Sequence, residues 1–83
     1  MRQCGDFSFQ VNGHTDSVGN RDRNIELSLA RAAAVKVYMV SRGASAEKID
    51  AVGFGPDVPI SDNETAAGRS ANRRIEFKIL EEG

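Results

Sequence analysis

The stretch FSFQVNGHTD, residues 7–16, decides the fold expected of this chain. Apolar and polar side chains alternate from Phe7 to Asn12, which predicts a strand with one covered face. Gly13 is expected to end this strand and to bend the backbone sharply. Asp16 then lies in a tight loop between the strand and a helix, and such loops are where binding groups collect.

A long helix is expected to follow this loop and to reach Ser41 or Arg42. Its N-cap is predicted to be Asn24 or Asp22, and Gly43 stands where a C-cap glycine belongs. The helix is apolar around most of its circumference, which is typical of a helix that is covered on more than one side. A chain of 83 residues can hardly supply that cover, so a preceding segment or a second subunit is expected to do so.

Two shorter strands are predicted at residues 49–54 and 75–79, with a turn at 44–48 before the first of them. A helical turn capped by residues 61–63 and stopped by Gly68 should lie between them. Strand, helix and strand form a βαβ unit, so the first two strands should be parallel. The predicted fold is a two-layer α/β sandwich within a single domain, 1–83, whose first residues carry no clear pattern. The apolar side chains expected to point inward are Phe7, Phe9, Val11, Ile75, Phe77 and Ile79.

Composition excludes several classes of protein. Eleven basic and twelve acidic residues give a net charge of −1, which argues against nucleic-acid binding. No run of 18 apolar residues and no signal-peptide pattern is visible. Cys4 is the only cysteine, so it is either an incidental thiol or a bridge between two copies.

Catalytic and metal chemistry find little support in the sequence. The seven serines share a single possible base, His14, and none lies in a nucleophile motif. His14 and Asp16 are too few ligands for zinc, which needs three or four. The chain is therefore expected not to be an enzyme and to hold no metal or cofactor.

Arg31 is the charged residue of greatest interest. Its neighbours at helical spacing are Leu27, Val35 and Tyr38, and a guanidinium buried among them would need an anion. Together with Asp16 it could form a receptor for a small zwitterion. Two simpler interpretations remain open: a plain ion pair between Arg31 and Asp16, or an arginine that reaches water. Asp16 could equally be a loop residue that accepts hydrogen bonds from nearby amides.

A basic cluster comes late in the chain. Only one aromatic residue accompanies it, so a solvated or ion-paired edge is favoured over a nucleic-acid surface. Arg73 shares the parity of Ile75, so it is expected to point toward the helix layer and to join the site of Asp16 and Arg31. The cluster consists of Arg69, Arg73, Arg74 and Lys78.

These motifs together resemble the OmpA-like C-terminal domain of OmpA-type porins, the peptidoglycan-associated lipoprotein and the flagellar stator protein MotB. The resemblance covers about residues 9–79. It is carried by Gly13-His14-Thr15-Asp16, Gly19, Asn24-x-x-Leu27-Ser28-x-x-Arg31-Ala32, Val35, Tyr38, Gly43, Gly53-Phe54-Gly55, Pro59, Asn63-x-Thr65-x-x-Gly68-Arg69 and Asn72-Arg73-Arg74-Ile75-Glu76.

The resemblance implies a βαβαββ fold that is truncated here, because the family's first strand and helix have no counterpart in the chain. It implies non-covalent binding of peptidoglycan through the diaminopimelate of the stem peptide. The implied ligand-binding residues are Thr15, Asp16, Asn24, Arg31 and, more weakly, Arg73. The implied place is the periplasm, at the outer membrane or cell wall, with any membrane contact made by an upstream region.

The alternative function is an assembly module. In that interpretation the same fold forms homodimers in an envelope or stator-type protein, and the ligand site is vestigial. The expected partners are therefore peptidoglycan and either a second copy or a missing upstream segment.

Overall fold

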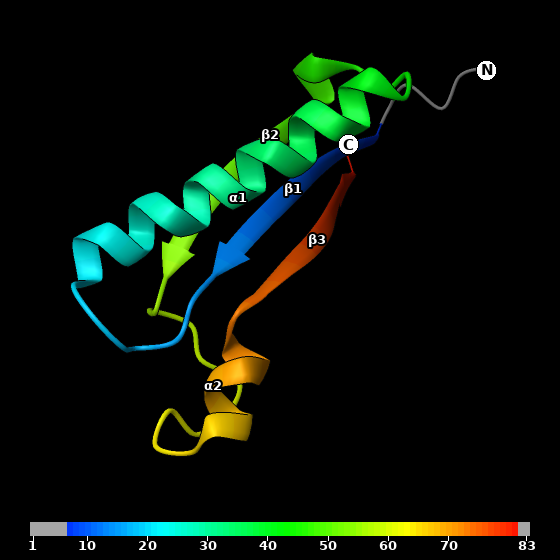
Figure 1. The fold of residues 1–83 in the computed structure, drawn as a ribbon. Helices are drawn as coiled ribbons and strands as arrows, with labels where there is room; N and C mark the ends of the chain where they lie inside the picture. The colour runs from blue at the N-terminus through cyan, green and yellow to red at the C-terminus, as the bar shows by residue number, and fades with distance from the viewer. Residues whose placement is uncertain (1–6, 82–83) are drawn as a thin grey trace.

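Three strands form one mixed sheet, and a long helix lies across one of its faces (Figure 1). The structure is a computed structural model that describes residues 7–81. Its elements are β1 (Phe7–His14), α1 (Arg21–Ser41), the 3-10 helix η1 (Ala46–Lys48), β2 (Ile49–Gly55), α2 (Ala66–Asn72) and β3 (Arg74–Glu81). The order strand, helix, strand, short helix, strand confirms the predicted two-layer α/β fold. None of the helices described is long and apolar enough to cross a membrane.

The strand order in the sheet is β2-β1-β3, so β1 is central. It pairs with β2 in parallel, as the βαβ pattern predicted, and with β3 in antiparallel orientation. The register places Phe9 beside Ile49 on one flank and beside Ile79 on the other. Directly paired residues project from the same face of a sheet. Phe9, Ile49 and Ile79 therefore point toward the side on which α1 lies, whereas Val52 and Leu80, which pair with Asn12 and Ser8, point to the other side.

Gly13 does not end the first strand, contrary to the prediction. β1 continues to His14, and a Cβ atom at Gly13 would lie 2.1 Å from the backbone oxygen of Ser28 in α1. The glycine is needed because strand and helix approach each other closely there, and not because the chain turns.

The start of α1 also differs from the prediction. The N-cap is Asn20, whose side chain accepts a hydrogen bond from the backbone N–H of Arg23 at 3.1 Å. Asn24 and Asp22 both lie inside the first turn. The predicted end is confirmed: Gly43 follows the helix with a φ of +106°, a conformation that glycine adopts without strain.

The short helix α2 begins later than predicted and runs through Gly68. Thr65 caps it by accepting a hydrogen bond from the N–H of Gly68 at 2.9 Å. Gly68 does not stop the helix. A Cβ atom there would lie 1.7 Å from the carbonyl oxygen of Asp62, so only glycine fits against the preceding loop. The last strand starts at Arg74, one residue before the predicted start.

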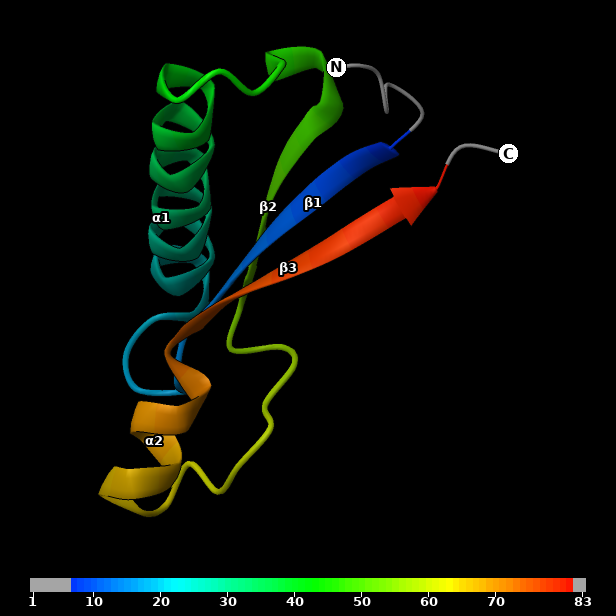
Figure 2. The ribbon, with the colours of Figure 1, turned by 90° about the vertical axis from the view of Figure 1, so that its right-hand side faces the viewer.

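The core is small and lies under α1. Val11, Ala32 and Ile49 are its fully buried members. The helix covers β1 and β2 but leaves β3 at the outer edge of the sheet (Figure 2). Phe77 and Ile79 point to the predicted face, yet they are 59 % and 63 % exposed. The prediction that they would be buried is therefore wrong, because no described element covers β3.

Candidate functional site

The loop between β1 and α1 leaves the sheet at the end where β2 also terminates (Figure 1). Its first residue is anchored to the sheet, since the N–H of Thr15 donates to the carbonyl of Gly55 at 2.9 Å. The hydroxyl of Thr15 donates to the carbonyl of Asp16 at 2.8 Å. Both Thr15 and Asp16 are buried, so this part of the loop is held firmly.

Asp16 is the best-defined charge of the site. One carboxylate oxygen accepts a hydrogen bond from the N–H of Val18 at 3.0 Å, as the loop-residue interpretation expected. The other oxygen accepts one from Nη1 of Arg73 at 2.6 Å. The Arg73 hydrogen bond is the main cause that lowers the pKa of Asp16, against the opposing effect of burial. The carboxylate is thus ionised at neutral pH, although only 12 % of the side chain is exposed.

Arg73 therefore reaches Asp16, as predicted, but strand parity is not the reason, because Arg73 lies outside β3. It is the C-cap residue of α2, directly before β3. The structure thereby joins two segments that are 57 residues apart in the sequence.

Arg31 does not pair with Asp16 in this structure. The residue is exposed on α1, and the described part of the chain, residues 7–81, offers it no hydrogen bond or ion pair. The first of the two simpler interpretations, a direct ion pair between Arg31 and Asp16, is not observed. The second is observed: the Arg31 guanidinium reaches water. All five of its N–H donors are available to an external anion.

Asn24 connects the helix to the loop. Its side-chain amide donates to the carbonyl of Val18 at 2.8 Å. Arg31 lies seven residues further, which is two helical turns, so it is on the same face of α1 about 10 Å along the axis. The helix face that holds the Asp16 loop is therefore also the face that carries Arg31.

Two asparagines, Asn63 and Asn72, belong to the motif that carries the resemblance, but their part in the site was not predicted. Asn72 is fully buried; its oxygen accepts from the N–H groups of Ile60 and Ser61, and its amide donates to the side-chain oxygen of Asn63. That same oxygen of Asn63 accepts from the N–H of Ser17 at 3.3 Å. The chain of bonds ties α2 to the loop that holds Asp16.

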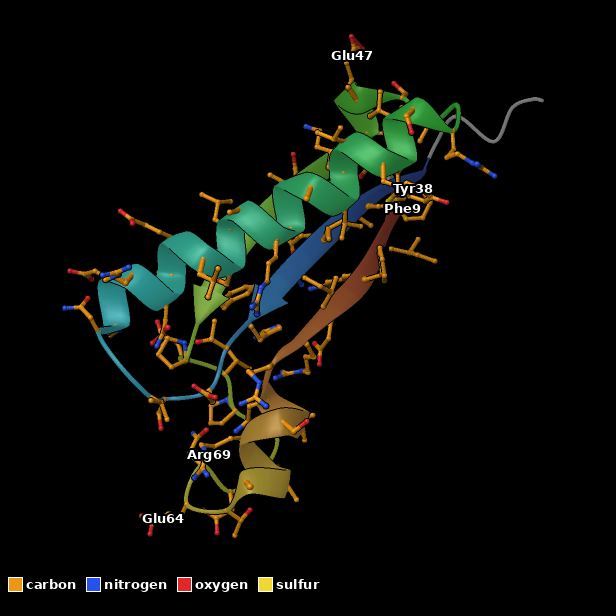
Figure 3. All side chains as sticks on the ribbon, in the orientation of Figure 1. Phe9, Tyr38, Glu47, Glu64 and Arg69 are labelled. Atoms are coloured by element: carbon orange, nitrogen blue, oxygen red, sulfur yellow. The ribbon has the colours of Figure 1, made fainter. Side chains whose placement is uncertain are left out.

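Arg69 belongs to the same end of the molecule. It projects from α2 toward the loops below the sheet (Figure 3), and its Nη1 donates to the carbonyl of Asn63 at 3.0 Å. Its charge also helps to lower the pKa of Asp16. Part of the basic cluster is therefore ion-paired or hydrogen-bonded. This agrees with the interpretation of the cluster as a solvated or ion-paired edge.

His14 lies on the face of the sheet that points away from α1. Its ring stacks on Phe54 at 5.3 Å between centroids, and its Nε2 is 3.7 Å from a carboxylate oxygen of Glu76. Burial is the main cause that lowers its pKa, with the charge of Arg74 as a second cause. Within residues 7–81 no three side chains of the metal-binding types come together.

These features define a class of protein. A fixed, ionised carboxylate and an unpaired guanidinium are mounted on a strand-end loop and on one helix of a small α/β domain. Such an arrangement suits the binding of a charged polar ligand, since charged hydrogen bonds need fixed partners.

The family follows from the sequence as a whole. The model of the OmpA family matches residues 2–73, and the chain belongs to that family. The chain is 40 % identical over 79 residues to the peptidoglycan-binding protein ArfA of Mycobacterium tuberculosis, covering 95 % of this chain and 24 % of that protein. It is 47 % identical over 68 residues to outer membrane protein A of Bordetella avium, covering 82 % and 35 %.

Solved structures show the same fold. The peptidoglycan-associated lipoprotein of Burkholderia pseudomallei superimposes with a TM-score of 0.87 at 25 % identity, over 92 % of this chain and 64 % of that one. A putative MotB-like protein of Desulfovibrio vulgaris gives 0.80 at 28 % identity, over 95 % and 52 %. The resemblance to the OmpA-like domain is thereby confirmed. The chain spans about a quarter to a third of the two curated relatives named above.

Proposed function

We propose that this domain binds peptidoglycan non-covalently and so anchors an envelope protein to the cell wall. The names of two similar proteins, peptidoglycan-binding protein ArfA and the peptidoglycan-associated lipoprotein, support the ligand class. The observation that carries the proposal is the ionised Asp16, held in a firm loop on the helix face that also presents the unpaired Arg31.

The ligand group that these charges suit is the free end of diaminopimelate, where one carbon carries an ammonium and a carboxylate. Asp16 would accept hydrogen bonds from the ammonium, and Arg31 would bind the carboxylate through two parallel N–H donors. An ionised carboxylate offers about four lone-pair sites, and two of those of Asp16 are already used. Capacity therefore remains for the ligand.

The strength of such a site is moderate. Hydrogen bonds to charged groups contribute roughly 1.5–3 kcal/mol each, and micromolar binding requires about 8 kcal/mol. Two charged groups with a few loop amides are thus enough for micromolar affinity. Binding breaks no bond, so the domain needs no catalytic base or cofactor, and we propose that it is not an enzyme.

Three residues are proposed to support the two main groups. Thr15 and Asn24 fix the loop through their hydrogen bonds to the carbonyls of Asp16 and Val18. Arg73 orients the Asp16 carboxylate and lowers its pKa further. The proposed place of action is the periplasm, at the outer membrane or cell wall, because similar proteins are named outer membrane porin F and outer membrane protein A.

The test is co-sedimentation of the purified chain with peptidoglycan sacculi. We expect Asp16→Asn and Arg31→Ala each to lower the affinity at least about tenfold, since each removes one charged interaction. Arg23→Ala is the matched control, because Arg23 is also an exposed arginine of α1. Circular dichroism checks that every variant is folded.

Competition identifies the part of the ligand that is bound. Free diaminopimelate should release the chain from sacculi, whereas Nα-acetyl-lysine amide, which carries the side-chain ammonium but no carboxylate, should not. Undiminished binding by both Asp16→Asn and Arg31→Ala would disprove the proposal. Release by Nα-acetyl-lysine amide and diaminopimelate alike would disprove the role given to Arg31.

A further inference from the structure

The peptide unit between Asp16 and Ser17 is held at both of its polar groups. Its carbonyl oxygen accepts the hydrogen bond from the hydroxyl of Thr15 at 2.8 Å. Its N–H donates to Oδ1 of Asn63 at 3.3 Å, from a residue 46 positions further along the chain. A peptide unit is planar and rigid, so two bonds to its opposite edges fix the direction in which the backbone leaves Asp16.

Asn63 is itself held in place by two residues of α2. Its Oδ1 accepts a second hydrogen bond, from Nδ2 of Asn72 at 2.8 Å, which uses both lone pairs of the amide oxygen. Its backbone carbonyl accepts from Nη1 of Arg69 at 3.0 Å. Both the side chain and the backbone of Asn63 are therefore anchored, and the residue can transmit that anchoring to the Asp16 loop.

Asn72 determines which way the amide of Asn63 points. Its oxygen accepts from the backbone N–H groups of Ile60 and Ser61 at 2.8 and 3.0 Å. Its Nδ2 donates to the carbonyl of Ser61 at 3.0 Å and to Oδ1 of Asn63. These four bonds are all that an amide side chain can make, and the residue is fully buried. Nδ2 of Asn72 must therefore face Asn63, and the amide of Asn63 must turn its oxygen toward this donor.

We propose that Asn63 is a positioning residue of the ligand site, which acts through the N–H of Ser17 to hold the Asp16 loop in its binding geometry. This inference rests on the proposed function, because it concerns affinity at the same site. Asn63 acts on the backbone next to Asp16, whereas Arg73 acts on the carboxylate itself. Without Asn63 the loop would have to be ordered when the ligand binds, and that ordering lowers the affinity.

The two ends of the same loop are anchored without Asn63. At the start, the N–H of Thr15 donates to the carbonyl of Gly55 at 2.9 Å. At the end, Nε and Nη2 of Arg21 donate to the two carboxylate oxygens of Asp57 at 3.0 and 2.6 Å. Loss of the Asn63 bond should therefore loosen the middle of the loop and leave the fold intact.

The first experiment measures amide hydrogen exchange at Ser17 by NMR, in the full chain and without ligand. Asn63→Leu keeps a side chain of similar size but removes the acceptor. The exchange rate of the Ser17 amide should rise about fivefold or more, because a local hydrogen bond is lost. The amides of β1 should exchange as in the wild type. The result does not depend on whether the domain binds peptidoglycan.

The second experiment measures the affinity for sacculi by co-sedimentation. Asn63→Leu should raise the dissociation constant about fivefold, the effect of one lost hydrogen bond. Asn63→Asp should bind as the wild type does, because its carboxylate accepts both hydrogen bonds that Oδ1 accepts now. Glu64→Leu is the matched control and should not change the affinity, since Glu64 is exposed and directed away from the rest of the molecule (Figure 3).

A further variant separates the acceptor from its charge. Asn63→Asp adds a negative charge that could attract the ligand ammonium by itself. The double variant Asn63→Leu/Ser61→Asp adds the same charge at an exposed position of the same segment and does not restore the acceptor. It should bind as weakly as Asn63→Leu. Thermal unfolding checks that every variant is folded.

Three results would overturn the proposal: unchanged exchange at Ser17 in Asn63→Leu, unchanged sacculus affinity of that variant, or an Asn63→Asp variant that binds as weakly as Asn63→Leu. The variant Asp16→Asn shows which proposal has failed. If Asp16→Asn loses binding and Asn63→Leu retains it, only the positioning role is wrong. If Asp16→Asn, Arg31→Ala and Asn63→Leu all bind fully, the proposed function is wrong, and the role of Asn63 falls with it.

Discussion

Ile49 and Ile79 occupy equivalent places on the two flanks of β1, yet their environments differ completely. Both pair with Phe9, and both point to the face on which α1 lies. Ile49 is 1 % exposed and Ile79 is 63 % exposed. An alternating pattern therefore fixes the face to which a side chain points, but it does not determine whether that face is covered.

The glycines explain which flank the helix covers. A Cβ atom at Gly13 in β1 would collide with the backbone oxygen of Ser28, and one at Gly53 in β2 would lie 2.6 Å from the backbone nitrogen of Leu29. β3 contains no glycine. α1 lies closely over β1 and β2 because their backbones permit it, and β3 remains to one side.

The largest expected effect comes from adding a side chain at the close contact between Gly13 and Ser28. Gly13→Ala places a methyl group where Ser28 oxygen stands, so helix and sheet must separate, at a cost of about 3 kcal/mol or more of unfolding free energy. Gly43→Ala is the control. Nothing lies within 4 Å of its added Cβ, and only the strain of a positive φ, about 1–2 kcal/mol, is expected. Denaturant unfolding measures both, and equal losses would contradict the contact.

The two isoleucines test the comparison directly. Ile49→Ala should lower the unfolding free energy by about 2–5 kcal/mol, because it leaves a cavity in the core. Ile79→Ala should change it by no more than about 0.5 kcal/mol, which is usual for exposed positions. The measurement is urea unfolding at a concentration where the chain is monomeric. A large loss for Ile79→Ala would show that its face is covered.

A smaller effect is expected at the polar end of the molecule. Arg73→Ala should lower the unfolding free energy at pH 7 by about 1 kcal/mol, the upper range for a partly exposed ion pair. Arg73 lowers the pKa of Asp16 in the folded state, so this stabilisation is full above the ordinary Asp pKa of 3.8 and is lost as the pH falls through the lowered pKa.

Urea unfolding of wild type and Arg73→Ala at pH 7, 5 and 3 follows this dependence. The difference between them should stay constant from pH 7 to pH 5 and should shrink at pH 3. Arg23→Ala, which removes another exposed arginine, should show no such difference. A gap that persists at pH 3 would mean that Arg73 acts through packing and not through Asp16.

The smallest effect concerns His14. Its folded-state pKa lies below 6.5, so the unfolded chain binds more protons in the window between the two values. Wild-type stability should therefore fall as the pH drops from 7.5 through 6.5 and should level off below the folded pKa. His14→Gln should remove this slope. Thermal unfolding at half-unit pH steps checks it, and an unchanged slope in the variant would assign the effect to another group.

Much of the fold could be predicted from short-range pattern. The alternation in β1 and β3, the parallel pairing of β1 and β2 and the C-terminal glycine of α1 were all predicted from neighbouring residues. Errors arose where a distant backbone decided the outcome. Gly13 and Gly68 looked like terminators, but each is a contact point with a segment that local sequence does not reveal.

The candidate site shows the same division. Asp16 and Arg31 came from the motif and the resemblance, and the approach of Arg73 to Asp16 came from strand parity. Asn63 and Asn72 belonged to the motif as well, but the hydrogen bonds that link Asn72 through Asn63 to Ser17 had no such signal. Hydrogen bonds between loops depend on where three separate segments end in space, and periodicity carries no information about that.

The sequence by itself determined the family, the order of strands and helices, and the face to which each apolar side chain points, because periodicity and capping act over a few neighbouring residues. Only the tertiary structure decided that Arg31 does not pair with Asp16, and that β3 lies uncovered. Those outcomes depend on the path of α1 across the sheet, which close backbone contacts at two glycines fix.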